Sequence, residues 1–132
     1  MLSKNKFYID GCWVQPNSSK KLEIINPSNS EVFAEVTLGD AIDLDLAVAA
    51  AKQALIDWGQ TSITERRAYL DKLLVIYKSR ATELAELISK EMGAPISLAK
   101  SAQVGSGIAH LKQAIKSLDE FAFQRTIPNG DT

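Results

Sequence analysis

The sequence predicts an α+β protein that is mostly α-helical, with small antiparallel β-hairpins at the N-terminus followed by long packed helices. Short β-prone pieces separated by turn residues occupy residues 1–38. From residue 39 onward, apolar residues recur every three or four positions, which is the helical period. Glycines and prolines divide this second part into separate helices. We therefore expect one segment, residues 1–132, with a β-hairpin region (1–38) and a helical region (39–132).

The β region contains two expected strand pairs. Phe7–Ile9 and Trp13–Val14 flank Asp10-Gly11, a common two-residue hairpin turn. Residues 22–25 and 32–36 form the second pair, joined by a stretch of asparagine, proline and serine that is typical of turns. Residues 7–36 are therefore expected to form small antiparallel sheets.

The first helix is expected to begin at Asp43, because acidic residues stabilise the positive end of a helix dipole. Gly59 is expected to end it, in the manner of a glycine just past a helix C-terminus. One face of this helix is apolar. Its members are Leu44, Val48, Ala51, Leu55 and Trp58.

Two further helical regions follow. Ser62-Ile63-Thr64-Glu65 matches a capping box and starts a helical pattern that runs to Met92. A gap in its apolar stripe between Tyr77 and Leu84 predicts a kink or two abutting helices. Gly93 is the next terminator, and Pro95 starts a last helix from about Ile96 to Phe123. Residues 127–132 have the composition of a turn.

Composition and charge restrict the classes of function. Hydrophobic residues make up 45% of the 132 positions and charged residues 23%, which is ordinary for one globular domain. The formal net charge of −1 offers no basic surplus for phosphates, so we expect no nucleic-acid partner. The sequence has neither an apolar run of membrane-spanning length nor a signal-peptide pattern, so no membrane partner is expected. A single cysteine fits a reducing compartment, and we predict a cytoplasmic protein.

Acidic residues are spread over polar helix faces at ordinary spacing. Paired catalytic carboxylates need a shared cleft and shifted pKa values, so this pattern favours solvated positions over acid–base chemistry. The residues concerned are Asp43, Asp45, Glu83, Glu86, Glu91, Asp119 and Glu120.

The single histidine and the single cysteine are weak candidates for chemistry. His110 could act as a general base, but no serine or cysteine is positioned in the sequence to suggest a nucleophile for it. A surface or packing role is therefore favoured. Cys12 has only Lys4 and Lys6 nearby to lower its pKa, which favours a structural role. One histidine and one cysteine far apart do not make a zinc site.

Two features of the last helix have alternative interpretations. Gly105-Ser106-Gly107 lacks the third glycine and the preceding strand of a dinucleotide fingerprint, so we expect the glycines to allow a close helix crossing. The apolar stripe Val104–Ala122 is either a core-facing surface or a partner-binding face. Its members are Val104, Ile108, Leu111, Ile115, Leu118 and Ala122.

Five stretches, in the correct order, resemble the N-terminal part of the NAD(P)-dependent aldehyde dehydrogenase superfamily. They correspond to the family's opening hairpin, its I-N-P strand pair, its first long helix, its E-R-x-x-x-L helix and its E-T/M-G-K/A-P segment. The stretches are FYIDGCWV, IINPSNSEVFAEV (with Ser30 where glycine is common), DLDLAVAAAKQALIDW, ERRAYLDKL and ELISKEMGAPI. The match runs from Phe7 to Thr132.

The resemblance implies an incomplete part of the family's nucleotide-binding domain. It makes EMGAPI a joint between helices and not the aldehyde pocket. The family oxidises an aldehyde to an acid: a cysteine thiolate attacks the carbonyl, hydride passes to NAD or NADP, and water releases the acid. The family's catalytic and cofactor-binding motifs lie further along the chain than these 132 residues. We therefore expect no catalytic residue, no cofactor-binding residue and no bound cofactor here, and no turnover by this chain alone.

One functional site is implied by the resemblance. Many members bind a monovalent cation through backbone carbonyls just before the N-P pair and an acidic residue just before the T/M-G pair. Ile24, Ile25 and Glu91 match those positions. A further ligand of the family site lies beyond this chain.

The leading hypothesis is an N-terminal fragment of an aldehyde dehydrogenase. The alternative is a standalone, non-catalytic helical module for oligomerisation or interaction. Part of the Val104–Ala122 stripe is expected to be exposed when the rest of the enzyme is absent. Because exposed apolar patches find partners, we expect a homo-oligomer formed through exposed helix faces.

Overall fold

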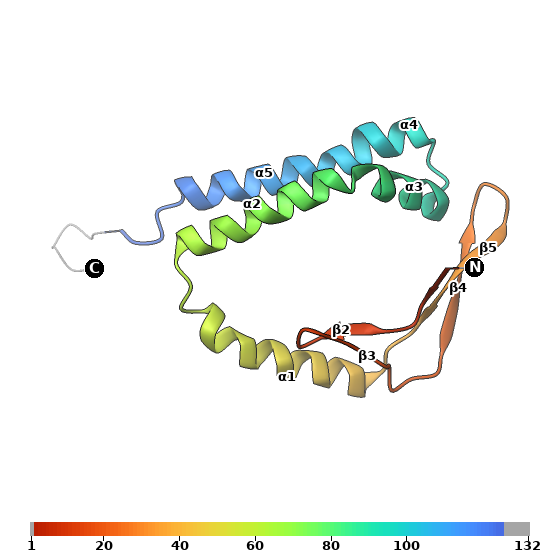
Figure 1. Cartoon of the computed structure of the whole chain (residues 1–132), viewed down its shortest axis with the longest axis horizontal. Coiled ribbons are helices and arrows are strands. Elements are labelled where there is room, and N and C mark those ends of the chain that lie inside the picture. Colours follow the sequence, from red (N-terminus) through yellow and green to blue (C-terminus); the bar gives the residue numbers. More distant parts are fainter. Residues whose placement is uncertain (1, 126–132) are drawn as a thin grey trace.

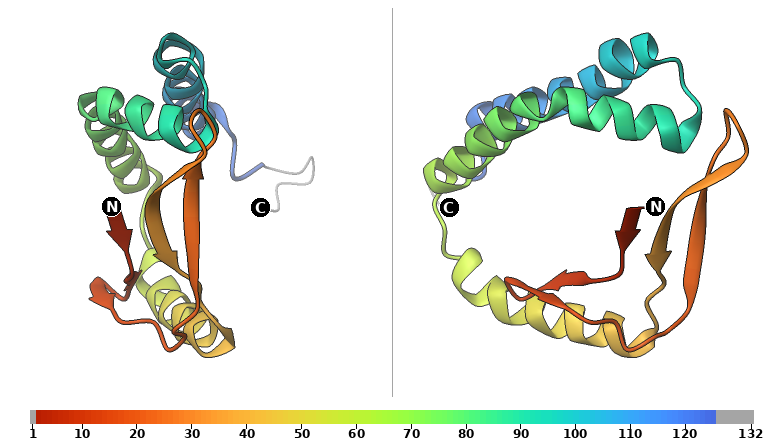
Figure 2. Two further views of the ribbon diagram at one scale, coloured as in Figure 1. Left: turned by 90° about the vertical axis from the view of Figure 1, so that its right-hand side faces the viewer. Right: turned by 45° about the vertical axis from the view of Figure 1, so that its right-hand side comes forward.

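An arch of helices closed at one side by a narrow sheet makes up the computed structural model, which describes residues 2–125 (Figure 1). One limb of the arch is a long helix beside a small hairpin. The other limb is a layer of helices, and the sheet spans the distance between the two limbs (Figure 2). The predicted class, mostly α with a small β portion, is confirmed. The turn expected at 127–132 lies outside the described residues.

The β portion contains five strands in two sheets. They are β1 (Leu2–Lys4), β2 (Phe7–Ile9), β3 (Cys12–Val14), β4 (Lys21–Asn26) and β5 (Glu31–Thr37). The β2–β3 hairpin is antiparallel with Phe7 opposite Val14, and β4 pairs antiparallel with β5, as predicted. The sequence did not predict β1, which pairs parallel with β5 in the order β1-β5-β4. A parallel strand needs a crossover, and here the hairpin is part of that crossover.

The helical portion contains more elements than the periodicity predicted. They are α1 (Ala41–Trp58), α2 (Ile63–Ser79), α3 (Ala81–Met92), α4 (Ile96–Leu98), a π-helical segment (Ala99–Gln103) and α5 (Val104–Glu120). The break expected between Tyr77 and Leu84 is confirmed, since only Arg80 separates α2 from α3. The expected continuous last helix is instead interrupted by the π-helical segment and ends before Phe121.

Side-chain caps explain where α1 and α2 begin. Asp40 is the N-cap of α1 and exchanges hydrogen bonds with Asp43, so α1 begins two residues before the predicted start at Asp43. The capping box of Ser62 and Glu65 at the start of α2 is confirmed. Gly59 lies at the end of α1 as predicted, but in a right-handed conformation (φ −61°) and not the left-handed one typical of a terminal glycine.

Arg66 holds the joint between α1 and α2. Its guanidinium donates to the backbone carbonyls of Trp58 at 3.2 Å and Gly59 at 3.4 Å, and to the Thr61 hydroxyl at 2.9 Å. It also lies 5.9 Å from the centre of the Trp58 ring, which in turn packs 5.5 Å from Tyr69. The arginine thus satisfies the free carbonyls at the end of one helix from the first turns of the next.

The core lies between α2, α3 and α5. Ala85, Ala99 and Val104 are buried together, and Tyr77 packs against them. Gly107 allows this close approach, because a Cβ there would lie only 2.6 Å from Cζ of Tyr77. The packing role predicted for the Gly105–Gly107 pair is therefore confirmed at Gly107, whereas a Cβ at Gly105 would meet nothing within 4 Å.

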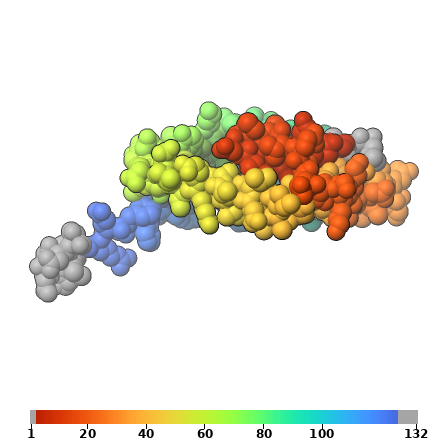
Figure 3. Space-filling model, turned by 90° about the horizontal axis from the view of Figure 1, so that it is seen from below, coloured from red at the N-terminus to blue at the C-terminus, as the bar shows by residue number. Residues whose placement is uncertain are grey.

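The exposed apolar surface lies on a different helix from the one predicted. Val104 and Ile115 of the Val104–Ala122 stripe are buried, so most of that stripe faces the core. On α1, by contrast, Leu44 is 63% exposed and Leu55 is 62% exposed. Figure 3 shows α1 (yellow) at the surface with the β2–β3 hairpin (red) along one side of it. The expectation of an exposed apolar helix face is confirmed, but its location was wrong.

Candidate functional site

The turn between β4 and β5 meets the end of α3 at the top of the sheet (Figure 2). Asn26 organises the turn: its side chain accepts from the Ser28 backbone N–H at 2.9 Å, and its carbonyl accepts from the Ser30 N–H at 2.8 Å. Ser30 adopts φ +60°, a left-handed conformation that favours glycine. This geometry explains why a glycine suits that position better than the serine found here.

The glycine of the EMGAP segment makes the contact from the other side. Gly93 has φ +69°, and its N–H donates to the Ser89 carbonyl at 2.9 Å. A Cβ at this position would lie 2.8 Å from Cγ of Pro27. The Ser89 hydroxyl donates to the Ala94 carbonyl at 2.7 Å and ties down the outgoing chain. The segment is therefore a tightly packed joint, as the resemblance implied.

The three residues expected to hold a monovalent cation lie on elements that contact each other at this junction. Ile24 and Ile25 are on β4, and Glu91 is in the last turn of α3, which packs against β4. Strand pairing is irregular at this point: Ile24 lies opposite Ala34 and Ile25 opposite Val32. β4 is also at the edge of its sheet, so some of its carbonyls have no strand partner within residues 2–125.

The donor chemistry of this set fits a hard cation. Two backbone carbonyls and one carboxylate are oxygen ligands, which hard cations prefer. Glu91 is exposed, so its carboxylate is accessible from solvent. No cluster of three or more histidine, cysteine or acidic side chains suitable for a metal occurs in the described part of the chain, so a site here depends on backbone oxygens.

The other acidic residues lie where the sequence predicted, with one exception. Asp45, Glu83, Glu86, Asp119 and Glu120 are exposed.

Asp43 is the exception, since it is only 6% exposed. Its carboxylate accepts from the backbone N–H of Asn17 at 2.8 Å and of Asp40 at 3.0 Å. Asn17 also donates through its side chain to Asp40 at 2.7 Å. These bonds attach the loop after β3 to the start of α1, and they make Asp43 a structural residue.

The shifted pKa values have local causes and do not indicate a catalytic group. The side-chain hydrogen bond from Asn17, with backbone bonds at the helix start, lowers the pKa of Asp40. The Ser62 hydroxyl and backbone N–H lower the pKa of Glu65 in the same way. The ion pair and hydrogen bonds between Arg80 and Glu83 lower the pKa of the glutamate and raise that of the arginine. The three carboxylates are at the starts of helices, where negative charge is stabilised.

The remaining sequence candidates are separated from one another. Cys12 is a free, exposed cysteine on β3, and His110 is exposed on α5. Ser106 donates its hydroxyl to the Ala102 carbonyl of its own helix at 2.8 Å, as expected for a residue inside a helix and not in a phosphate loop. None of these positions approaches the arrangement of a nucleophile and a base.

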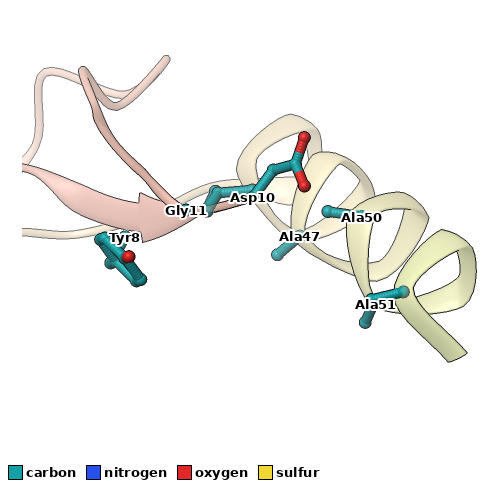
Figure 4. A pocket seen from close by; sticks show the side chains of 8 residues that line it. Tyr8, Asp10, Gly11, Ala47, Ala50 and Ala51 are labelled. Atoms are coloured by element: carbon teal, nitrogen blue, oxygen red, sulfur yellow. The ribbon is translucent and has the colours of Figure 1, made fainter. Parts of the chain in front are cut away.

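A shallow, open groove runs between the β2–β3 hairpin and α1. Its volume is about 320 Å³. In Figure 4, Tyr8, Asp10 and Gly11 of the hairpin lie on one side and alanines of α1 on the other. The alanines are Ala47, Ala50, Ala51 and Ala54. Because its helix side offers only methyl groups, the groove is a loosely packed contact between the hairpin and α1.

The arrangement of elements agrees with comparisons to known proteins. The model of the aldehyde dehydrogenase family matches residues 13–132. The chain belongs to the aldehyde dehydrogenase family. A curated relative from Staphylococcus aureus is 38% identical over 124 residues, which are 94% of this chain and 26% of the relative. The chain therefore spans about a quarter of the length of the curated relatives that it matches.

Two solved aldehyde dehydrogenases contain the same arch. The enzyme of Bartonella henselae is 43% identical, with a TM-score of 0.95 over 99% of this chain and 28% of that one. A mutant of aldehyde dehydrogenase C from Pseudomonas syringae, in complex with NAD+ and octanal, is 40% identical with a TM-score of 0.91 over 93% and 25%. No helix in the described residues is long and apolar enough to cross a membrane.

The sequence did not predict two structural features, the helix cap made by Arg66 and the π-helical segment before α5. Arg66 was part of the quoted E-R motif, but its role as a cap for α1 depends on a carbonyl from the preceding helix. The π-helical segment gave no signal in the apolar period. Within it, the side-chain oxygen of Gln103 is buried without a hydrogen-bond partner among the described residues.

Proposed function

We propose that this chain supplies the N-terminal part of an enzyme that oxidises an aldehyde to a carboxylic acid with NAD or NADP. The supporting observation is the agreement of the whole arch with the Bartonella henselae aldehyde dehydrogenase at a TM-score of 0.95. The complex of the Pseudomonas syringae protein with NAD+ and octanal supports the cofactor and the class of substrate.

The proposed reaction converts an aldehyde, NAD+ and water to a carboxylic acid, NADH and a proton. When bound, the nicotinamide accepts the hydride. We assign no catalytic or cofactor-binding residue to positions 1–132. Cys12 and His110, the chain's only cysteine and histidine, are exposed on separate elements. In this proposal the chain acts as scaffold, with the hairpin region 1–38 and the helical region 39–132 working as one segment in the cytoplasm.

The test compares this chain alone with the same chain joined to the rest of an aldehyde dehydrogenase. The added part is the region of the Bartonella henselae enzyme that follows its match to residues 1–132. We expect aldehyde-dependent NADH formation from the joined polypeptide and none from residues 1–132 alone. Turnover by residues 1–132 alone would contradict the assignment of scaffold, and an inactive but folded fusion would contradict the enzymatic proposal.

We also propose a monovalent cation site formed by the carbonyls of Ile24 and Ile25 and the carboxylate of Glu91. The contact between β4 and α3 and the oxygen donor set support it. In the joined polypeptide, Glu91→Gln is expected to reduce the rise in melting temperature caused by sodium or potassium chloride. Glu86→Gln, at an exposed position on the same helix, is the control. Equal salt responses in both variants would contradict the site.

In the absence of the rest of the enzyme, we propose that residues 1–132 self-associate through the exposed apolar face of α1. Leu44 and Leu55 are both more than half exposed, and apolar patches of several hundred Å² attract partners. In light scattering over a dilution series, the mean mass of the particles is expected to decrease as the protein is diluted. A monomer mass at every concentration would refute this proposal.

A further inference from the structure

The helix α1 is apolar on most sides, yet few other side chains pack against its apolar face. We call Leu44, Val48, Leu55 and Trp58 the α1 face. These four side chains are 63%, 42%, 62% and 45% exposed. Within residues 2–125, α1 packs against β2 and, through Trp58 at its end, against Arg66 and Tyr69 of α2. A helix that is apolar nearly all round belongs in the interior of a larger structure.

The total exposed area points to a large absent contact. The chain of 14.4 kDa exposes 10033 Å². A folded monomer of that mass exposes about 6,800 Å². The excess of roughly 3,000 Å² is summed over the whole chain, of which the α1 face is one part, and it is at least as large as the area that one partner buries in an obligate interface, about 1,000–2,500 Å².

The charges of α1 make a second copy of this chain a poor occupant. The exposed charges of the helix are Asp45 and Asp57 against one lysine, Lys52. A symmetric dimer places the same patch on both sides of the interface, so like charges come together. Like-charge contact costs free energy and favours a different partner. Self-association through this face is therefore expected to be weak and easily displaced.

The solved structures supply a candidate occupant for the α1 face. The arch is kept, at a TM-score of 0.95, inside a chain of which it forms only 28%. We propose that the α1 face is a docking surface for the remaining three quarters of an aldehyde dehydrogenase polypeptide, and that this contact forms without a peptide bond between the two parts. The inference rests on the proposed function for the identity of the partner.

The physical reason is the size of the contact. A covalent connection mainly raises the effective concentration of one part near the other, to about the millimolar range for short linkers. An interface of obligate size obtains its affinity from buried apolar surface, so the link is not required for binding.

The experiment co-expresses residues 1–132, carrying one affinity tag, with the later part of the Bartonella henselae enzyme as a separate polypeptide with a second tag. Co-expression avoids the need for either part to be stable alone. The mass of the doubly purified product is measured by light scattering. We expect a complex that contains equal numbers of the two polypeptides.

A matched pair of variants tests the surface. Leu55→Gln removes an apolar side chain from the α1 face, and Lys52→Gln introduces the same residue three positions earlier on the same helix. Both positions are exposed in this chain, so neither change is expected to unfold it. Loss of one buried leucine is expected to weaken the complex about tenfold or more, while Lys52→Gln leaves it unchanged.

A complex that Leu55→Gln weakens and Lys52→Gln does not supports the proposal. Recovery of residues 1–132 only as self-associated chains, or a complex that both variants affect equally, overturns it. The polypeptide in which the two parts are joined separates this result from the proposed function. Activity of the joined form without binding of the separate parts overturns docking alone, whereas an inactive, folded joined form overturns the enzymatic proposal.

Discussion

Gly107 and Gly105 form a matched pair of positions two residues apart in α5. A Cβ added at Gly107 would overlap the Tyr77 side chain, with 2.6 Å to Cζ, whereas one added at Gly105 would meet nothing within 4 Å. Tyr77 packs against the buried cluster around Ala85, so its ring cannot move aside without disturbing the core. Gly107→Ala and Gly105→Ala therefore differ mainly in this one contact.

The expected magnitudes follow from two opposing effects. Replacing a helical glycine by alanine stabilises the helix by about 1 kcal/mol, and this gain applies to both variants. Forcing extra volume into a packed contact costs about 1–3 kcal/mol, and this cost applies only to Gly107→Ala. We therefore expect the free energy of unfolding to be about 1–3 kcal/mol higher for Gly105→Ala than for Gly107→Ala. For a chain of this length, each kcal/mol corresponds to about 4 °C in melting temperature.

Circular dichroism during thermal and urea unfolding measures this difference. Both variants are compared with the unmodified chain at one low protein concentration, because self-association would shift the apparent stability. Tyr77→Leu shortens the opposing side chain, and in that background the penalty at Gly107 is expected to shrink. Equal stability of Gly105→Ala and Gly107→Ala would refute the close crossing of α2 and α5.

Three further outcomes are expected. Ser30→Gly removes the strain of a left-handed serine and should raise the free energy of unfolding by up to about 1 kcal/mol in urea. Gly93→Ala combines a left-handed alanine with an overlap against Pro27, and a loss of about 1–3 kcal/mol is expected; an unchanged melting temperature would contradict this contact. The pKa of Glu65 is lowered in the folded chain, so its stabilisation is complete above its ordinary value of 4.5 and is lost as pH falls through the lowered pKa. Glu65→Gln should therefore make the melting temperature less sensitive to acid in that range, and an unchanged acid dependence would argue against the capping box.

Local signals in the sequence determined most element positions. The Asp10-Gly11 turn, the Ser62–Glu65 capping box and the terminator Gly93 each act through neighbouring backbone groups, so the sequence alone predicts them. The break after Tyr77 was visible for the same reason, as a gap in a local repeat. The residues that match the family were likewise readable as a pattern, and the comparisons confirmed the family.

Only the tertiary structure decided which apolar faces are covered. Apolar residues recur every three or four positions in both α1 and α5, yet Val104 of α5 is 2% exposed and Leu55 of α1 is among the exposed residues. The helical period reveals that a face is apolar but not which surface lies opposite to it, because the partner residues are distant in the sequence. Burial of Asp43 and the parallel pairing of β1 depended on Asn17 and β5 in the same way. Sequence by itself determined where this chain turns, caps and repeats, whereas the spatial packing of distant segments decided which of its faces remain free to bind.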